Sequence, residues 1–152
     1  MAVNPVPAGY STVTPMLCIK GAGAAIDFYK KAFNATEIYR IPGPGGLIMH
    51  AEIKIGNSIV MLSDETPQGS NKSPATTGAS TGSQMLYVDK VDDWYKQACD
   101  AGGTGSMPPM DMFWGDRMGM ITDPYGHSWA IASHIEDVSP AQMQERMAAM
   151  AH

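Results

Sequence analysis

The stretch "DFYKKAFNA" at residues 27–35 returns almost unchanged as "DWYKQACDA" at residues 93–101. Asp, Tyr, Lys and two Ala residues recur at matching positions, and Trp94 stands where the first copy has Phe28. Around both copies, apolar residues follow the i, i+3, i+4, i+7 period of an amphipathic helix. They are Ala25, Phe28, Tyr29 and Ala32 in the first copy, and Val91, Trp94, Tyr95 and Ala98 in the second. We therefore predict two related helices, each with one apolar stripe that packs on a sheet.

The segments around the two helices also correspond. Strand-like "STVTPMLCIK" precedes the first helix, and "TEIYRI", "LIMHAEIKI" and "SIVML" follow it. Strand-like "SQMLYV" precedes the second helix, and "TGSMPPM", "MFWGDRMGMIT" and "HSWAIAS" follow it. Each half therefore reads as strand, helix and three strands. After the second half, Ser139, Pro140 and Gln142 carry the signature of a helix start with a capping box.

These elements predict one domain over residues 1–152 with an α+β fold. Two βαβββ modules form a curved mixed sheet around a cavity, and the helices lie outside. The first module covers about residues 10–63 and the second about residues 82–134. A linker rich in Ser, Thr, Gly and Pro covers about residues 64–81, and a Met-rich C-terminal helix covers about residues 139–150.

Composition narrows the class of protein. The 152 residues are 44% hydrophobic and 16% charged, with a net charge of -5, which suits a single globular domain. A negative balance argues against nucleic acid and anionic membrane as partners, because both attract a basic surface. The chain shows neither ~18 consecutive apolar residues nor a signal-peptide pattern. Cys18 and Cys99 lie far apart in apolar patterns, so we expect free thiols in a reducing compartment, the cytoplasm.

Five segments resemble the vicinal-oxygen-chelate superfamily, which includes glyoxalase I, bleomycin-resistance proteins and extradiol dioxygenases. They are "GAAIDFYKKAFNA", "MHAEIKIGNSIVMLSDE", "QMLYVDKVDDWYKQACDAGG", "FWGDRMGMITDPYGHSW" and "HIEDVSPAQMQERM". Together they span nearly the whole chain and are most similar to the PhnB-like branch. The resemblance implies a cup built from two modules, paired within one chain or between the chains of a homodimer. It also implies either catalysis at a divalent metal or binding of a small molecule without turnover.

Enzymes of this superfamily hold their metal through His, Gln or Glu side chains on the first and fourth strands of each module. Carried over to this sequence, the four positions are Thr14, Met61, Ser83 and Ala130. None is a usual metal ligand, and a shift by one position adds at best the amide of Gln84. The resemblance therefore implies no metal and no cofactor here, and it leaves open whether the protein is an enzyme.

Two other groups of residues are candidates for chemistry. His50 and Glu52 alternate with apolar residues, so they share one strand face. They form a ligand-recognition pair, an unusual metal or acid–base site, or a hydrogen-bonded row with only a structural role. In "FWGDRMG", Trp114 and Arg117 either hold a planar or anionic ligand or serve packing and ion pairing.

Our leading hypothesis is a metal-free small-molecule-binding protein that forms a cytoplasmic homodimer and sequesters a drug or a metabolite. The expected ligand contacts are Thr14, Met16, His50, Glu52, Met61, Ser83, Met85, Trp114 and Arg117. The alternative is a glyoxalase-like lyase or isomerase, or a dioxygenase, with a non-standard metal or acid–base site at His50 and Glu52. Catalytic residues, the identity of the ligand and the role of the C-terminal helix stay open.

Overall fold

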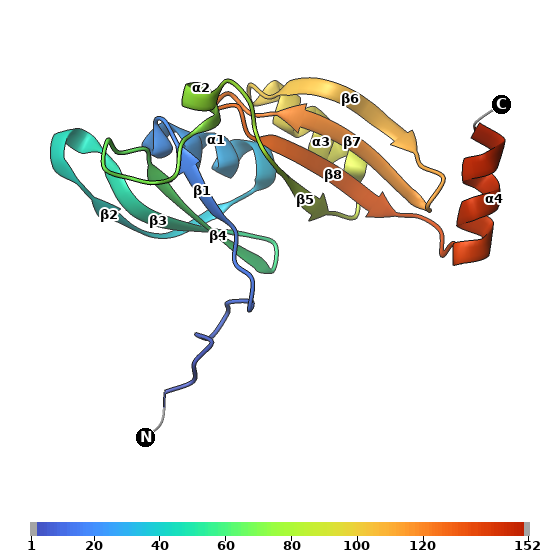
Figure 1. The fold of residues 1–152 in the computed structure, drawn as a ribbon, viewed down its shortest axis with the longest axis horizontal. Helices are drawn as coiled ribbons and strands as arrows, with labels where there is room; N and C mark the ends of the chain where they lie inside the picture. Colours follow the sequence, from blue (N-terminus) through green and yellow to red (C-terminus); the bar gives the residue numbers. More distant parts are fainter. Residues whose placement is uncertain (1–2, 151–152) are drawn as a thin grey trace.

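Each half of the chain forms a four-stranded sheet with one long helix against it (Figure 1). The structure is a computed structural model that describes residues 3–150. The first module consists of β1 (Met16–Ile19), α1 (Ala22–Phe33), β2 (Thr36–Pro42), β3 (Ile48–Ile55) and β4 (Ser58–Asp64). The second consists of β5 (Ser83–Tyr87), α3 (Val91–Asp100), β6 (Thr104–Asp111), β7 (Asp116–Thr122) and β8 (Ser128–His134). The short helix α2 (Pro74–Thr77) lies between the modules, and α4 (Pro140–Met150) follows them.

The two sheets have the same topology. Their strand orders are β1-β4-β3-β2 and β5-β8-β7-β6. The first strand of each module runs parallel to the fourth, and the other neighbours are antiparallel. The register is equivalent too, because Met16 lies opposite Met61 in one sheet and Met85 lies opposite Ala130 in the other. The predicted α+β fold of two βαβββ modules is confirmed, with the strands arranged as two four-stranded mixed sheets.

Local geometry sets the start and end of α1. Gly21, with a φ of 94°, precedes the helix, and its N–H and that of Ala22 both donate to Oδ1 of Asp64 at the end of β4. A carboxylate at a helix N-terminus satisfies free N–H groups and interacts well with the helix dipole. Asn34, with a φ of 53°, ends the helix in the left-handed conformation common at C-caps.

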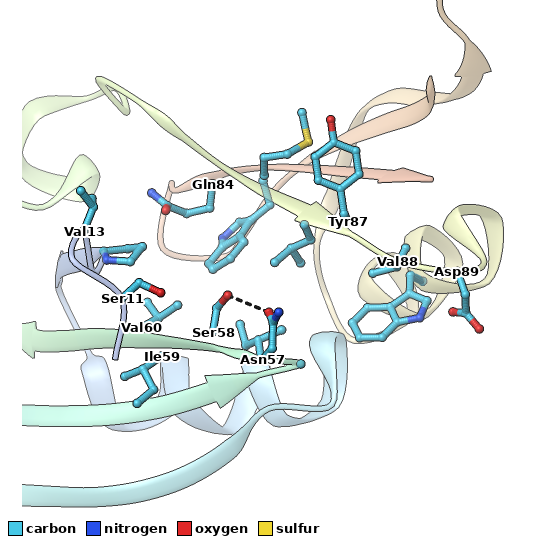
Figure 2. A pocket seen from close by; sticks show the side chains of 17 residues that line it. Ser11, Val13, Asn57, Ser58, Ile59, Val60, Gln84, Tyr87, Val88 and Asp89 are labelled. Carbon is cyan, nitrogen blue, oxygen red and sulfur yellow. Dashed lines mark hydrogen bonds between the residues drawn. The ribbon is translucent and has the colours of Figure 1, made fainter. Parts of the chain in front are cut away.

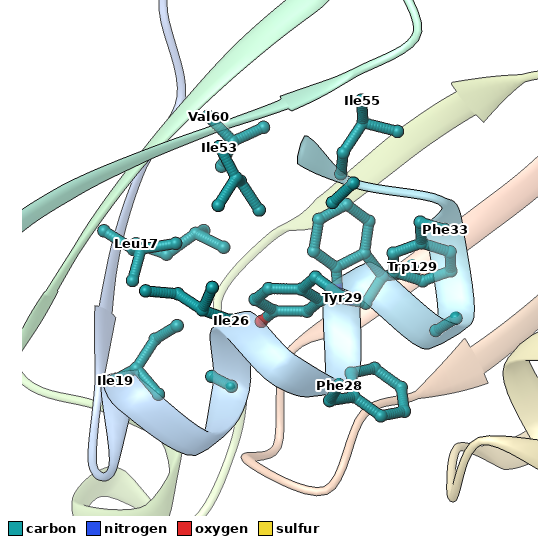
Figure 3. Packing of buried hydrophobic residues seen from close by; sticks show 14 of the residues in the cluster. Leu17, Ile19, Ile26, Phe28, Tyr29, Phe33, Ile53, Ile55, Val60 and Trp129 are labelled. Atoms are coloured by element: carbon teal, nitrogen blue, oxygen red, sulfur yellow. The ribbon is translucent and has the colours of Figure 1, made fainter. Parts of the chain in front are cut away.

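One continuous core joins the two modules (Figure 3). The ring of Trp129, from β8, lies 5.2 Å from the ring of Tyr29 and 4.7 Å from that of Phe33, both on α1. All three side chains are fully buried. Nearby, Nε2 of Gln97 on α3 donates to the backbone oxygen of Lys31 at 2.8 Å. The prediction that Trp129 is a core residue is confirmed, and its aromatic neighbours come from the helix of the other module.

The C-terminal helix α4 stands apart from both sheets at one end of the molecule (Figure 1). Its predicted capping box is present: Ser139 Oγ accepts from the N–H of Gln142, and Gln142 Oε1 accepts from the N–H of Ser139. None of its residues is buried. Arg146 ties it to the body through a bidentate ion pair with Glu136, with N–O distances of 2.6 and 2.8 Å.

Within residues 3–150, no helix combines the length and the apolar character needed to cross a membrane.

Candidate functional site: the open faces of the two sheets

Each sheet has one face that its helix does not cover, which we call its open face. On β3, Ala51 and Ile53 are buried in the core, and Glu52, between them, lies on the open face. Strand register then defines a row of four adjacent side chains across each open face. In the first module the row is Met16, Met61, Glu52 and Tyr39. In the second module it is Met85, Ala130, Met120 and Met107.

These rows leave apolar side chains in contact with solvent. Met16 is 58% exposed and Met85 47% exposed, although they occupy equivalent positions in the two sheets. Tyr87, two residues after Met85 on the same strand face, is 63% exposed. Exposed apolar side chains that lie side by side, as Met85 and Tyr87 do, are typical of binding or association sites.

The open face of the first module carries a buried carboxylate. Glu52 is only 2% exposed, because three side chains gather around it. Its Oε1 accepts a 2.9 Å hydrogen bond from the hydroxyl of Tyr39 and lies 3.1 Å from Nε2 of His50. Its Oε2 accepts a hydrogen bond from the hydroxyl of Tyr10, which comes from the segment before β1. We call Glu52, Tyr10, Tyr39 and His50 the Glu52 cluster.

Hydrogen bonds shift the pKa values of Glu52, Tyr10 and Tyr39 in this cluster. Burial opposes ionisation of Glu52, but the bonds from Tyr10, His50 and Tyr39 outweigh it, and the carboxyl pKa lies below its ordinary value. The same bond to Glu52 is the main reason why the pKa of Tyr10 rises to about 12. It likewise raises the pKa of Tyr39. At neutral pH the cluster therefore holds an ionised carboxylate and two protonated phenols.

A cavity of about 380 Å³ lies beside the Glu52 cluster. Thr14, Met61 and Glu52 form one side of it, and residues 5–7 and 10–12 of the N-terminal segment form the other. The Thr14 side chain also donates a 3.0 Å hydrogen bond to the backbone oxygen of Ser11, within that segment. The segment before β1 thus covers part of the open face.

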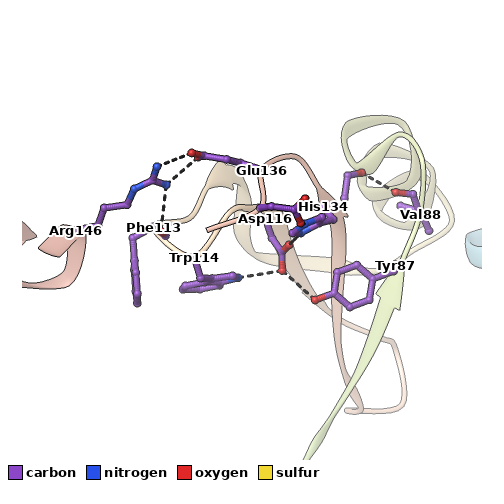
Figure 4. Close-up of polar contacts among 10 residues, drawn as sticks. Tyr87, Val88, Phe113, Trp114, Asp116, His134, Glu136 and Arg146 are labelled. Carbon is purple, nitrogen blue, oxygen red and sulfur yellow. Dashed lines mark hydrogen bonds and ion pairs between the residues drawn. The ribbon is translucent and has the colours of Figure 1, made fainter. Parts of the chain in front are cut away.

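The open face of the second module carries a comparable group around Asp116 (Figure 4). Asp116 is 4% exposed, and its Oδ2 accepts hydrogen bonds from the Tyr87 hydroxyl at 2.9 Å and from Nε1 of Trp114 at 3.0 Å. Its Oδ1 lies 2.8 Å from Nδ1 of His134, whose Nε2 lies 2.9 Å from Asp137. Burial opposes ionisation of Asp116, yet these bonds outweigh it and lower the carboxyl pKa.

Two further hollows lie near the boundary between the modules. A groove of about 580 Å³ runs between the β3–β4 hairpin, residues 55–60, and residues 84–89 of the second module (Figure 2). Met85 is the one predicted ligand contact among its lining residues. A more polar hollow of about 470 Å³ lies under the linker, where the Cys18 thiol donates to the backbone oxygen of Asn71. Burial raises the pKa of that thiol, so the thiolate needed for nucleophilic attack is disfavoured.

The structure brings most of the predicted ligand contacts onto the open faces. Thr14, His50, Glu52 and Met61 gather in the first module, beside Met16. Ser83 lies opposite Ser128, in register with Met85 and on the same face of β5. Trp114 binds Asp116 through its indole N–H and packs edge-to-face on Phe113.

Arg117 lies on the opposite face of its sheet. It alternates on β7 with Asp116 and Met118, so its side chain points toward α3. Nε and one terminal nitrogen each donate 2.8 Å bonds to the carboxylate of Asp92 on α3. The other terminal nitrogen donates to Asp111 at 2.9 Å. This placement corrects the expectation that Arg117 orients a ligand, because the guanidinium is engaged by two carboxylates away from the open face.

The four positions at which superfamily enzymes hold a metal do not fit a metal here. Thr14 and Met61 lie near one another in the first module, and Ser83 and Ala130 in the second. They offer two hydroxyls, a thioether and a methyl group, whereas divalent metals in such sites need imidazole or carboxylate donors. In the described part of the chain, no three His, Cys, Asp or Glu side chains gather as a metal site would require.

Several of the residues that surround Glu52 and Asp116 were not predicted from the sequence. Tyr10, Tyr39, Tyr87, Asp116 and His134 were not among the predicted ligand contacts. Period-two alternation with Ser83 and Met85 would have placed Tyr87 on the open face. For Tyr10 the sequence holds no such signal, because it meets Glu52 from 42 residues away.

Comparison with known proteins agrees with this geometry. The sequence model of the Glyoxalase/Bleomycin resistance protein/Dioxygenase superfamily matches residues 12–131. An uncharacterized protein of Mycobacterium bovis, Mb0911c, is 38% identical over 150 residues, which cover 97% of this chain and 96% of that protein. The crystal structure of TioX from Micromonospora sp. ML1 is 26% identical, with a TM-score of 0.65 over 82% of this chain and 99% of TioX.

The PhnB protein from Bacillus cereus shares the fold at 17% identity, with a TM-score of 0.62 over 81% of this chain and 99% of that protein. The chain therefore belongs to the glyoxalase/bleomycin resistance protein/dioxygenase superfamily, and its structural neighbours include the PhnB-like proteins.

Proposed function

We propose that this protein binds a small apolar or aromatic molecule on its open faces, without a metal. The observation that carries the proposal is the pair of equivalent rows, Met16–Met61–Glu52–Tyr39 and Met85–Ala130–Met120–Met107, each rich in methionine. Methionine side chains are flexible and polarizable, so such rows adapt to ligands of irregular shape. The carboxylates of Glu52 and Asp116 and their hydrogen-bonding neighbours would then orient the bound ligand, as a few polar groups do in a mostly apolar site.

We further propose that the protein works as a homodimer. Met16 and Met85, which begin the two rows, are 58% and 47% exposed, and burying them would remove apolar surface from water at roughly 25 cal/mol per Å². Because the modules share one topology, a two-fold axis can set the first module of one chain against the second module of its partner. A two-fold arrangement of this kind repeats the same contact twice and closes two identical cavities. Among the described residues both cysteines, Cys18 and Cys99, are free thiols, which supports placement in the cytoplasm.

The neutral dye Nile red tests the binding proposal, because its emission rises on transfer from water to an apolar site. Wild-type protein is expected to bind it, and Met120→Glu to weaken binding at least about tenfold by placing a charge in the second row. Met147→Glu is the matched control, since Met147 is 53% exposed on α4, away from both open faces. Equal binding by both variants would refute the proposed site. Size-exclusion chromatography with light scattering tests the dimer, for which twice the mass of one chain is expected.

An acid–base enzyme is the second candidate function, favoured by the contact between His50 and Glu52. A carboxylate 3.1 Å from Nε2 orients the imidazole ring and supports a role as proton acceptor. Incubation with metabolite extracts in deuterium oxide would detect such chemistry by NMR. Loss of specific C–H signals with wild-type protein, and their retention with His50→Gln, would favour the enzyme over the binding protein.

A further inference from the structure

We propose that Glu52 recognises an organic ammonium group, and that the Tyr10 hydroxyl takes the place of that group while no ligand is bound. This inference rests on the proposed function and names the class of ligand. Three features of the structure lead to it: the distribution of donors around the carboxylate, the lack of a basic partner, and the cavity beside it.

The two oxygens of Glu52 are not equally occupied. Oε1 faces two groups of the sheet itself, the Tyr39 hydroxyl at 2.9 Å and His50 Nε2 at 3.1 Å. Oε2 receives only the hydroxyl of Tyr10. Oε2 thus carries one donor where Oε1 carries two, so a ligand that replaces this donor leaves the contacts of the sheet in place. Its present donor comes from the segment before β1, so it can leave without disturbing the sheet.

Among the residues that the structure describes, Glu52 also has no lysine or arginine as a partner, so its charge is free to pair with a cationic ligand. The more exposed acidic groups pair with arginine, as Asp92 does with Arg117 and Glu136 with Arg146. The buried Asp64 and Asp123 are held by N–H and O–H donors of the protein instead. Across residues 3–150, neither lysine nor arginine forms an ion pair with Glu52, and His50 is its one basic neighbour. Hydrogen bonds from neutral hydroxyls keep Glu52 ionised, but they supply no opposite charge. A ligand that brings a positive charge would therefore gain a charge-assisted hydrogen bond that neutral donors cannot give.

The surroundings suit a cation with an apolar body. Tyr39 bonds to the carboxylate from within the sheet, so its aromatic side chain stays near a cation bound there, and aromatic rings attract organic cations. The thioether of Met61 lines the adjoining cavity of about 380 Å³, with Thr14 as a further hydrogen-bonding group. An anion would meet the Glu52 charge in this cavity and would be repelled. The site therefore selects by charge as well as by shape.

The surroundings of Asp116 in the second module resemble those of Glu52. It is buried, flanked by the aromatic side chains of Tyr87 and Trp114, and has His134 as its one basic neighbour in the described part of the chain. Both of its oxygens, however, are engaged by groups of its own module, and Oδ2 already accepts two bonds. Glu52 is therefore the carboxylate with room for a ligand, and Tyr125, on the β7–β8 turn beside Phe28, serves as the control for Tyr10.

Three probes of similar shape test the inference: benzylammonium chloride, benzyl alcohol and sodium benzoate, titrated by calorimetry. Wild-type protein is expected to bind benzylammonium about tenfold more tightly than benzyl alcohol, and benzoate most weakly. Tyr10→Phe should tighten benzylammonium binding severalfold, because no hydroxyl then competes for Oε2. Tyr125→Phe should leave it unchanged, because Tyr125 packs against Phe28 on α1 rather than on an open face. Glu52→Gln should remove the preference for the cation, with circular dichroism to verify folding.

Equal affinities for the cation and the alcohol in wild-type protein would overturn the inference, and this comparison needs no variant. So would tightening of the same size in Tyr10→Phe and Tyr125→Phe. If either result came with Nile red binding that Met120→Glu weakens as expected, the ammonium site would be wrong while the proposed function stood. If neither Nile red nor the three probes bound, both would fail.

Discussion

The hydroxyl of Tyr29 donates a 2.7 Å hydrogen bond to Oδ2 of Asp123, which joins the helix of the first module to the β7–β8 turn of the second. Both residues are buried. Asp123 also accepts a 2.9 Å bond from Nε1 of Trp129, and its Oδ1 accepts the N–H groups of Tyr125 and His127. One carboxylate therefore fixes the turn of its own module and the helix of the other.

Replacing Tyr29 with Phe should destabilise the protein by about 1.5–3 kcal/mol. The substitution keeps the aromatic packing on Trp129 but removes a buried hydrogen bond to a charged acceptor. Urea unfolding followed by tryptophan fluorescence measures the free energy of unfolding. Tyr125→Phe is the control, because the Tyr125 hydroxyl forms no side-chain hydrogen bond in the described structure. Equal losses in the two variants would show that the bond to Asp123 does not couple the modules.

Replacing Gly115 with Ala should be more harmful than the same change at Gly45. Both glycines have positive φ, at 98° and 67°, so a side chain adds backbone strain of about 1–2 kcal/mol at either position. At Gly115 a Cβ would also lie 2.1 Å from the backbone oxygen of Glu136, whereas at Gly45 it would meet no atom within 4 Å.

The extra loss at Gly115 should be at least about 1 kcal/mol, as expected for overpacking at a rigid contact. The backbone oxygen of Gly115 accepts hydrogen bonds from the N–H groups of Ile135 and Glu136. An added Cβ at Gly115 would therefore displace residues 135 and 136, which lead to α4, and strain these bonds. Chemical denaturation of both variants measures the difference. Similar losses would mean that this segment moves away freely.

The fold could be predicted from sequence because its signals are local and repeated. The spacing of Phe28 and Tyr29, and of Trp94 and Tyr95, marks two helices, and the strands around them alternate with period two. Equivalence of the modules follows from the repeat itself. Which residues share an open face is also a local property, and it places Met16 and Met61 correctly once the strands are known.

The polar clusters could be predicted only in part, because their partners come from distant segments. His50 and Glu52 are two residues apart on one strand and were found together. Tyr10 reaches Glu52 across 42 residues, and Tyr87 reaches Asp116 across 29, so no local pattern reports either contact. The expectation for Arg117 failed for another reason. A guanidinium group is a common ligand anchor, but strand alternation places Arg117 on the face of β7 that meets α3, where it pairs with Asp92.

The imidazole of His134 should titrate above its ordinary pKa of 6.5. Its hydrogen bond to Asp137 raises the pKa most, followed by its bond to Asp116. A raised pKa in the folded state means that the protonated ring favours folding. That contribution is fully present below the unfolded pKa, near 6.5, and is lost as the pH rises through the higher folded value.

NMR titration of the histidine ring protons measures the His134 pKa directly. Asp137→Asn should lower it, because the substitution removes the largest cause of the shift. Asp100→Asn is the control, since Asp100 lies on α3 and pairs with Lys96 rather than with the ring. A His134 pKa that did not respond to Asp137→Asn would show that the contact with Asp137 does not persist in solution.

Chelation should leave the protein's melting temperature and its Nile red binding unchanged. The side chains of Thr14, Met61, Ser83 and Ala130 supply no imidazole or carboxylate, so a divalent ion would gain too little binding energy at these positions to stabilise the fold. Purification without chelators, followed by elemental analysis, should find well under one divalent metal per chain. Stoichiometric metal whose removal by EDTA lowers the melting temperature would contradict this expectation. If His50→Gln also lost that metal, the metal ligands would lie at the Glu52 cluster, and the enzyme would become the better-supported function.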